Sequence, residues 1–158
     1  MEIGNLLKSK NLFLATAESC SGGFLGHLIT NVPGSSDYYL GGLIAYSNIL
    51  KESLLEVKTE TLTTHGAVSR ETVLEMALGM RNVFKGKYSP ENIVGLSTSG
   101  IAGPGGGSVE KPVGTVWIGI SSQRSKDAFL FRFDGIREEI KMQTALQAIQ
   151  ILFQHLTV

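Results

Sequence analysis

The chain has 158 residues, 42% apolar and 18% charged, which suits one globular domain that buries about two thirds of its unfolded surface. Its 14 basic and 14 acidic residues cancel and form no run of like charge, so nucleic acid is not expected as a main partner. One cysteine excludes an intramolecular disulfide, and no apolar run approaches the roughly 20 residues of a membrane span, so we expect a cytoplasmic protein with no membrane partner.

The first half of the chain alternates strand-like and helix-like segments. Residues 1–10 carry too few apolar side chains for a signal peptide. Turn signals rich in glycine, serine and proline separate the later segments. The apolar runs and spacings predict strands at residues 12–17 and 38–46, and helices at residues 24–29, 48–55 and 59–64.

The second half contains longer elements. Ser69 is a good N-cap for a helix that continues to Phe84. The remaining predicted elements are a strand at 93–97, a hairpin at 113–120 and 128–133, and a closing helix at 137–156. No repeat or linker divides the chain, so we expect one α/β domain over residues 1–158. Its mixed β-sheet should be covered by helices on both faces, as an α/β/α sandwich.

The segment from Ser99 to Ser108 is the most unusual feature of the sequence, because it holds five glycines between two strand-like segments. Glycine lets backbone N–H groups turn toward an anion. Ordering so many glycines costs conformational entropy, which favours ligand binding over a plain connection. The segment lacks the signatures of a P-loop and of a G-x-G-x-x-G motif, so neither a kinase nor a dehydrogenase is predicted. Ser108 to Lys111 matches S-x-x-K only literally, because the surrounding glycines and proline oppose the helix that this motif needs.

A second anion site is predicted at residues 19–23, Ser-Cys-Ser-Gly-Gly, between a strand and a helix. Unpaired N–H groups and the helix dipole favour an anion there, although simple N-capping explains the same residues. Cys20 would be a nucleophile if the helix start lowered its pKa, whereas burial is the commoner fate of cysteine. The three histidines, His27, His65 and His155, are scattered, so no metal is expected.

Ser36, Tyr46 and Lys51 flank the second predicted strand. A serine and a lysine can hydrolyse an amide when the lysine is neutral enough to accept the serine proton, which requires burial or a nearby cation to lower its pKa. Taken from the residues alone, ordinary roles as a turn serine, a strand tyrosine and a solvated lysine are the favoured explanation of all three. Spacing alone does not show that they converge.

Six motifs, in order along nearly the whole chain, resemble the CinA C-terminal family, the nicotinamide-mononucleotide amidohydrolases. They are AESCSGG (17–23), GSS (34–36), AYSN (45–48), HGAVS (65–69), SGIAGP (99–104) and KPVGTV (111–116). The resemblance implies that the chain is one amidohydrolase domain. It would convert the carboxamide of nicotinamide mononucleotide, a small pyridine nucleotide, to nicotinate mononucleotide and ammonia in pyridine-nucleotide recycling, without metal or cofactor.

The resemblance also implies roles for single residues. It places the serine nucleophile at Ser36, the lysine base at Lys51 and an assisting tyrosine at Tyr46, with backbone N–H groups stabilising the oxyanion. Ribose and phosphate would be held by the helix start and the glycine loop. The implied substrate-binding residues are Ser19, Ser21, Gly22, Gly23, Ser99, Gly100, Gly103, Gly105, Lys111 and Arg137.

The sequence departs from the family pattern near the last predicted helix. The family often has Gly-Asp-Arg and a second arginine four residues later, whereas this chain has Ile136 before Arg137, and Lys141. Lysine lacks the bidentate fork of arginine, so these changes bear on substrate affinity. They also motivate an alternative to the amidohydrolase, a non-catalytic nucleotide-sensing or partner-binding module. A separate alternative is a thiol amidase that uses Cys20. The sequence leaves homo-oligomeric assembly open.

Overall fold

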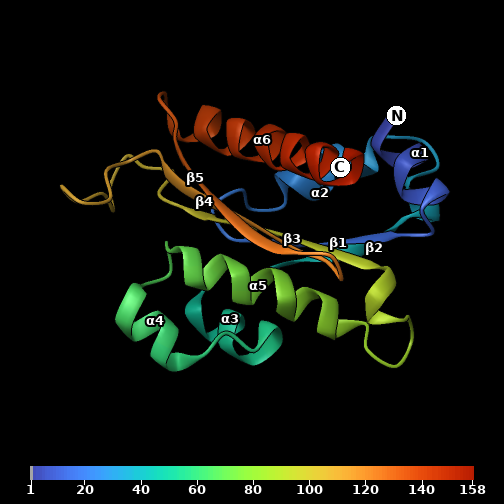
Figure 1. The fold of residues 1–158 in the computed structure, drawn as a ribbon. Helices are drawn as coiled ribbons and strands as arrows, with labels where there is room; N and C mark the ends of the chain where they lie inside the picture. The colour runs from blue at the N-terminus through green and yellow to red at the C-terminus, as the bar shows by residue number, and fades with distance from the viewer. Residues whose placement is uncertain (1) are drawn as a thin grey trace.

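The computed structural model describes residues 2–158, which form one five-stranded sheet with helices on both faces (Figure 1). The strands are β1 (Phe13–Glu18), β2 (Tyr39–Ile44), β3 (Ile93–Gly100), β4 (Thr115–Ser121) and β5 (Lys126–Arg132). The helices are α1 (Glu2–Ser9), α2 (Phe24–Thr30), α3 (Asn48–Leu55), α4 (Thr59–His65), α5 (Arg70–Val83) and α6 (Arg137–Thr157), with short 3-10 helices η1 (Ser35–Asp37) and η2 (Pro90–Asn92).

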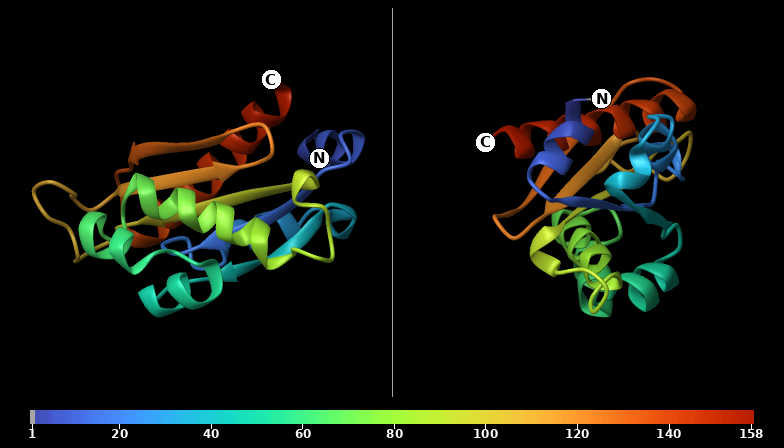
Figure 2. Two further views of the ribbon diagram at one scale, coloured as in Figure 1. Left: turned by 60° about the horizontal axis from the view of Figure 1, so that its bottom comes forward. Right: turned by 90° about the vertical axis from the view of Figure 1, so that its right-hand side faces the viewer.

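The molecule has three layers. Helices α1, α2 and α6 cover one face of the sheet, and α3, α4 and α5 cover the other, as the two further views in Figure 2 also show. The predicted α/β/α sandwich with a mixed sheet is therefore confirmed.

The strand order is β2-β1-β3-β4-β5. Strands β2, β1 and β3 run parallel to one another, whereas β4 is antiparallel to β3 and β5 is antiparallel to β4. The carboxyl ends of β1, β2 and β3 therefore meet at one edge of the sheet. Ligands bind outside such an edge in open α/β sheets, and the glycine-rich loop that follows β3 projects from it, at the left of Figure 1.

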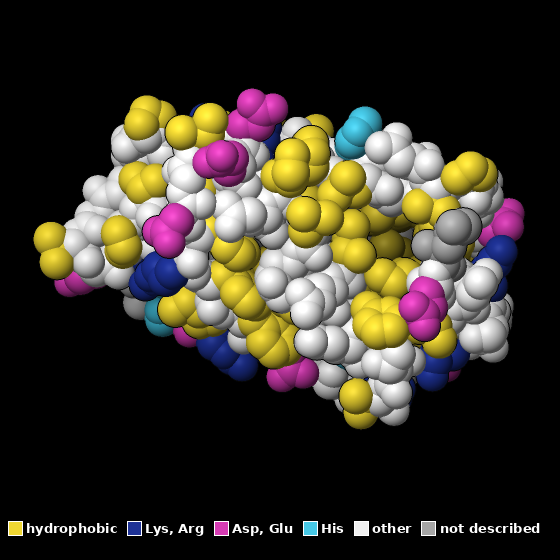
Figure 3. Space-filling model, turned by 90° about the horizontal axis from the view of Figure 1, so that it is seen from above, with side chains coloured by type: hydrophobic (Ala, Val, Ile, Leu, Met, Phe, Trp, Pro, Cys, Tyr) yellow, Lys and Arg dark blue, Asp and Glu magenta, His cyan; other side chains and the backbone are white. Residues whose placement is uncertain are grey.

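Two apolar cores hold the helices on the sheet. The larger core lies between the sheet and α1, α2 and α6, and is built around buried residues such as Leu14, Leu96 and Leu152. The smaller core lies on the other face, where Met76 and Met80 of α5 pack with Leu55 of α3. On the α6 side, apolar side chains also gather at the surface (Figure 3).

Most predicted elements are present with shifted ends. Strand β3 extends three residues beyond its predicted end at Ser97, to Gly100. The hairpin loop is shorter than expected, because β4 and β5 continue pairing up to Ser121 and Lys126. Helix α1 was not predicted. Its eight residues include Ile3, Leu6 and Leu7, which pack against the larger core.

Candidate active site

A cleft of about 280 Å³ opens at the carboxyl edge of the parallel strands. Its walls come from the turn after β1, the segment after β2, the connection before α5, the loop after β3 and the start of α6. The lining residues are Ser19, Cys20, Tyr46, Asn48, Lys51, Ala67, Val68, Ser99, Gly100, Ile101, Ala102, Gly103, Gly105, Gly106 and Arg137.

Lys51 is the only lysine or arginine among the largest fully buried side chains of residues 2–158, with 1% of its surface exposed. Ser47 caps α3 by accepting a hydrogen bond from the N–H of Leu50, and this helix carries Lys51 toward the cleft. The Lys51 Nζ donates to the carbonyl oxygens of Ala45 at 3.0 Å and Tyr46 at 3.2 Å. Burial lowers the pKa of Lys51 from its ordinary value of 10.5, against an opposing contribution from Cys20.

Ser19 is the third hydrogen-bond partner of the Lys51 ammonium, with 3.1 Å between Nζ and Oγ. Its backbone N–H donates to the carbonyl oxygen of Thr98 on β3 at 2.9 Å, which fixes the residue directly after β1. In a neutral lysine, two N–H groups would still serve the two carbonyls, and the lone pair would be left for the serine proton. The pair therefore has the geometry of a nucleophile and its base.

Glu18 holds the turn that carries Ser19. One carboxylate oxygen accepts hydrogen bonds from the N–H groups of Gly23 at 2.9 Å and Leu25 at 3.0 Å, and from the Ser21 hydroxyl at 2.7 Å. The other oxygen accepts from the N–H of Gly26 at 2.8 Å. The start of α2 is thus already occupied by an anion that belongs to the chain itself.

This carboxylate corrects the predicted anion site at residues 19–23. The Ser21 side chain is fully buried between Glu18 and Thr98 and does not reach the cleft. Gly22 and Gly23 adopt left-handed backbone conformations in the turn and also lie outside the cleft lining. Of residues 19–23, only Ser19 and Cys20 line the cleft.

We expect Glu18→Gln to destabilise the fold, because the amide replaces an acceptor oxygen with a donor that must face backbone N–H groups. The loss should be about 1–3 kcal/mol in the free energy of unfolding. Urea denaturation measures it, with Glu60→Gln as the matched control, since Glu60 is exposed in the first turn of α4. Equal stability of the two variants would contradict a structural role for the Glu18 carboxylate.

Tyr46 and Arg137 meet across the mouth of the cleft. Tyr46 is 59% exposed, and its hydroxyl accepts a hydrogen bond from Arg137 Nη2 at 2.9 Å. Arg137 Nη1 donates to the carbonyl oxygen of Gly103 at 2.7 Å. The guanidinium therefore ties the start of α6 to the glycine-rich loop and to the segment after β2, and it supplies positive charge at the cleft.

The structure places only some residues of the predicted glycine loop at the cleft. Ser99, Gly100, Gly103 and Gly105 line the cleft, and the Ser99 hydroxyl donates to the carbonyl oxygen of Ala67 at 2.7 Å. Lys111 is not part of the lining, because its Nζ donates to the carbonyl oxygen of His65 at 2.9 Å, at the end of α4. Lys111 thus anchors the loop on the neighbouring helix.

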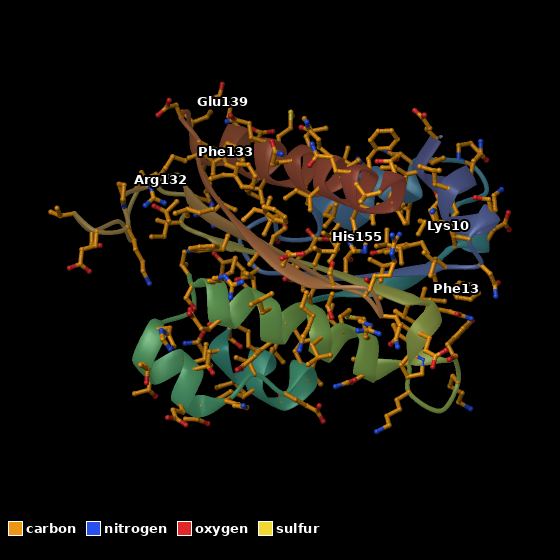
Figure 4. The ribbon with its side chains drawn as sticks, viewed as in Figure 1. Lys10, Phe13, Arg132, Phe133, Glu139 and His155 are labelled. Atoms are coloured by element: carbon orange, nitrogen blue, oxygen red, sulfur yellow. The ribbon has the colours of Figure 1, made fainter. Side chains whose placement is uncertain are left out.

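Ser36 lies far from Lys51, and the structure corrects the expected convergence of these residues. Ser36 belongs to η1, just before β2, and the first residue of β2, Tyr39, pairs with Leu14 near the start of β1. Lys51 lies beyond the other end of this six-residue strand, and a strand of that length spans about 20 Å. In Figure 4, Phe13 at the start of β1 and Phe133 before α6 lie toward opposite ends of the sheet.

Cys20 lines the cleft, but its thiol is poorly suited to attack. Burial raises its pKa to about 12, although a backbone hydrogen bond and the nearby Thr144 and Lys51 act in the other direction. A thiol nucleophile needs the opposite shift. For the amide hydrolysis that the resemblance implies, we therefore expect Cys20→Ala to keep the rate of ammonia release within about threefold of the parent chain, a change of under 1 kcal/mol in activation energy. Loss of turnover in a folded variant would restore the thiol hypothesis.

A serine and a histidine also meet away from the cleft, beside a hollow of about 380 Å³ between β5 and the end of α6. The His155 Nε2 lies 3.0 Å from the Ser122 Oγ, and Figure 4 shows His155 on the inner side of α6. The Ser122 hydroxyl already accepts from the N–H groups of Arg124 and Ser125 in a turn. No carboxylate of residues 2–158 is hydrogen-bonded to the histidine ring, so the pair lacks the third group that orients a catalytic histidine.

The part of the chain that the structure describes contains no group of three histidine, cysteine, aspartate or glutamate side chains placed to hold a metal. Within the same residues, no helix is long and apolar enough to cross a membrane. The sequence reasoning missed Asn48 and Glu18, and it also left out the lining residues Ala67, Val68, Ile101, Ala102 and Gly106. Asn48 lines the cleft beside Tyr46, and Glu18 organises the turn. The signal for Glu18 was its position directly before a glycine-rich helix start, where a carboxylate can serve several N–H groups.

Comparison with known proteins places these features in a family. The family model described as CinA C-terminal domain matches residues 1–156. A putative competence-damage inducible protein of Moorella thermoacetica is 45% identical over 153 residues, covering 97% of this chain and 36% of that protein. A Nicotinamide-nucleotide amidohydrolase PncC of Shigella flexneri is 41% identical over 155 residues, covering 97% of this chain and 90% of that protein. The chain spans about a third of the length of the first curated relatives that it matches.

Solved structures give the same result. The CinA superfamily protein KP700603 of Klebsiella pneumoniae superposes with a TM-score of 0.89 at 30% identity, covering 98% of this chain and 93% of that one. The competence/damage inducible protein CihA of Agrobacterium tumefaciens has a TM-score of 0.85 at 36% identity, covering 100% and 97%. The resemblance read from the motifs is therefore confirmed, and the chain belongs to the CinA C-terminal domain family.

Proposed function

We propose that this protein hydrolyses the carboxamide of nicotinamide mononucleotide, with Ser19 as the nucleophile and Lys51 as the base. The observation that carries the proposal is the buried Lys51 amine, with a lowered pKa, 3.1 Å from the Ser19 hydroxyl at the wall of a cleft. The similarity to the Nicotinamide-nucleotide amidohydrolase PncC of Shigella flexneri supports the reaction and the substrate.

In the first step, neutral Lys51 accepts the Ser19 proton as Oγ bonds to the amide carbon. The tetrahedral intermediate carries its negative charge on the former amide oxygen. The backbone N–H of Cys20, the residue after the nucleophile, donates to no backbone carbonyl of residues 2–158, and it is our candidate donor to this oxyanion. The Lys51 ammonium then protonates the leaving nitrogen, so that the carbon–nitrogen bond breaks and ammonia departs.

The second step releases the acid from the serine ester. Water attacks the ester carbon while Lys51 accepts one of its protons. The carbon–oxygen bond to Ser19 then breaks, and the proton returns to Oγ. The products are nicotinate mononucleotide and a restored Ser19–Lys51 pair. Apart from the attacking water, the chain supplies every group that these steps use.

The remaining cleft residues suit the rest of the nucleotide. Val68 and Ile101 provide apolar contact surface for a pyridine ring, and Arg137 provides positive charge for the phosphate. Tyr46 then acts by holding Arg137 through its hydroxyl, rather than by relaying the serine proton. This assignment moves the nucleophile from Ser36, to which the family resemblance gave that role, to Ser19, while Lys51 keeps its role as base.

The test is ammonia release from nicotinamide mononucleotide by the purified protein, combined with calorimetric binding of the same nucleotide. Ammonia and nicotinate mononucleotide formed in equal amounts would support the amidohydrolase. Binding without ammonia would favour the non-catalytic nucleotide-binding alternative, which the unusual Ile136 and Lys141 motivate. Absence of both binding and turnover would reject this nucleotide as the ligand.

A further inference from the structure

The two outer strands of the sheet, β2 and β5, differ in how well they are protected against pairing with a further strand. Strand β2 contains two glycines, and its pairing with β1 shifts register between Leu14 and Ala15. The seven residues of β5 contain no proline and pair with β4 in an unbroken register. Prolines, bulges and short strands protect exposed edges in other proteins, because a regular edge can pair with another chain. In the left view of Figure 2, the β4–β5 hairpin forms the upper border of the sheet.

Alternate residues of β5 direct their backbone groups away from the sheet. The N–H of Phe133, directly after β5, donates to the carbonyl oxygen of Gly114 at 2.9 Å. Neighbouring residues of an antiparallel strand direct their N–H and C=O groups to opposite sides, so the odd-numbered residues of β5 bond to β4. Among residues 2–158, no backbone hydrogen bond outside the sheet engages the even-numbered residues. The residues with outward backbone groups are Lys126, Ala128, Leu130 and Arg132.

The side chains along this edge are apolar in the middle and charged at the ends. Phe129 is 42% exposed and Leu130 is 45% exposed. Phe129 lies beside Ile118 on the face that α6 covers, and Leu130 points to the other face. Lys126 begins the strand, Asp134 lies two residues beyond its end, and both are exposed. The edge therefore offers both apolar surface and opposite charges to a strand laid beside it.

We propose that β5 pairs with β5 of a second copy of this chain, antiparallel and about a two-fold axis through Leu130. The two sheets then join into one continuous sheet. The backbone of Leu130 bonds to Leu130 of the other copy, and Ala128 of each copy bonds to Arg132 of the other, which gives about six hydrogen bonds. Phe129 of each copy lies opposite Phe131 of the other, and such aromatic cross-strand pairs stabilise a sheet.

The charges at the two ends of the edge favour this register. With Leu130 on the axis, the Lys126 ammonium of each copy faces the Asp134 carboxylate of the other. An axis through Phe129 would instead place Lys126 of each copy opposite Arg132 of the other. Like charges directly opposite one another destabilise a strand pair, whereas opposite charges stabilise it. The sequence of the edge is thus complementary to itself about Leu130.

Sedimentation velocity of the full chain measures the dissociation constant of the dimer. We expect the parent chain to dimerise and Lys126→Glu to raise the dissociation constant about tenfold or more, because an attractive pair becomes repulsive on both sides of the axis. Asp134→Lys should act in the same way. The double variant Lys126→Glu/Asp134→Lys exchanges the charges and should restore the parent value. Both positions are exposed, so the variants should fold.

The matched control is Lys58→Glu, which makes the same change at an exposed residue before α4 and should leave the dissociation constant unchanged. Parent chain that stays monomeric at the highest concentrations measured would overturn the proposal. A dimer that both single variants leave intact would overturn it as well, because the copies would then meet at another face. A double variant as weak as the single variants would reject the register about Leu130.

Amide hydrogen exchange tests the strand pairing itself. As the parent chain dimerises with rising concentration, exchange at the outward amides of Ala128, Leu130 and Arg132 should slow about tenfold or more. The amides of Phe129 and Phe131 bond to β4 and should be protected at every concentration. Exchange at the three outward amides that does not change on dimerisation would overturn pairing through β5.

Discussion

Ser19→Ala should abolish ammonia release from nicotinamide mononucleotide, whereas Ser36→Ala should leave it nearly unchanged. Ser19 is the hydroxyl that lies against the buried Lys51 amine, and Ser36 lies at the far end of β2. Loss of a serine nucleophile lowers kcat by about 10³-fold or more. Steady-state assays of ammonia release on the two purified variants measure the difference.

The two serines control for each other, because both substitutions remove one hydroxyl next to the sheet. Circular dichroism and thermal unfolding establish that each variant is folded. Full activity of Ser19→Ala would reject Ser19 as the nucleophile. Loss of activity confined to Ser36→Ala would return the role to Ser36, and the serine would then have to reach Lys51 from another copy of the chain.

Replacing Lys51 should separate a base from a positive charge. Lys51→Met removes the amine but keeps the apolar stem, and Lys51→Arg keeps a charge that cannot be lost near neutral pH. Both variants should lose about 10²–10⁴-fold in kcat/KM, as expected for removal of a general base. If positive charge were the only requirement, the arginine variant would keep most of its activity.

The pH dependence provides a second readout for the same residue. The protonated amine cannot accept the serine proton, so kcat/KM should rise with pH as Lys51 deprotonates. Because burial lowers the pKa of Lys51 from 10.5, the rise should be centred below that value. Lys51→Met should remove the rise along with the activity. A profile that falls with increasing pH across this range would contradict a neutral lysine base.

The sequence was sufficient for most of the fold, because the long elements carry strong periodic signals. Helix α5 begins after its predicted N-cap at Ser69, where the serine hydroxyl accepts from the N–H of Thr72. Helix α1 escaped notice because eight residues give only two turns, and its stability depends on packing against α6, which is distant in the sequence.

The sequence indicated many of the residues of the site, but not which of them lie close together. Lys51 and Ser19 meet because β2 pairs alongside β1 and brings α3 to the end of β1, and sequence spacing does not contain that pairing. The position of Ser36 could have been inferred, since residues before and after a strand lie at its opposite ends. The anion site at the start of α2 failed because Glu18, in the preceding strand, satisfies the same N–H groups.

Lys51 and Ser19 follow strands that differ in their number of neighbouring strands. Ser19 follows β1, which has a neighbouring strand on each side, whereas Lys51 follows β2, the outermost strand with one neighbour. Edge units open locally at lower free energy than central strands. Local opening of β2 and α3 therefore withdraws the Lys51 amine from the cleft while the rest of the domain stays folded. Catalytic activity should then be lost under milder denaturing conditions than the overall fold.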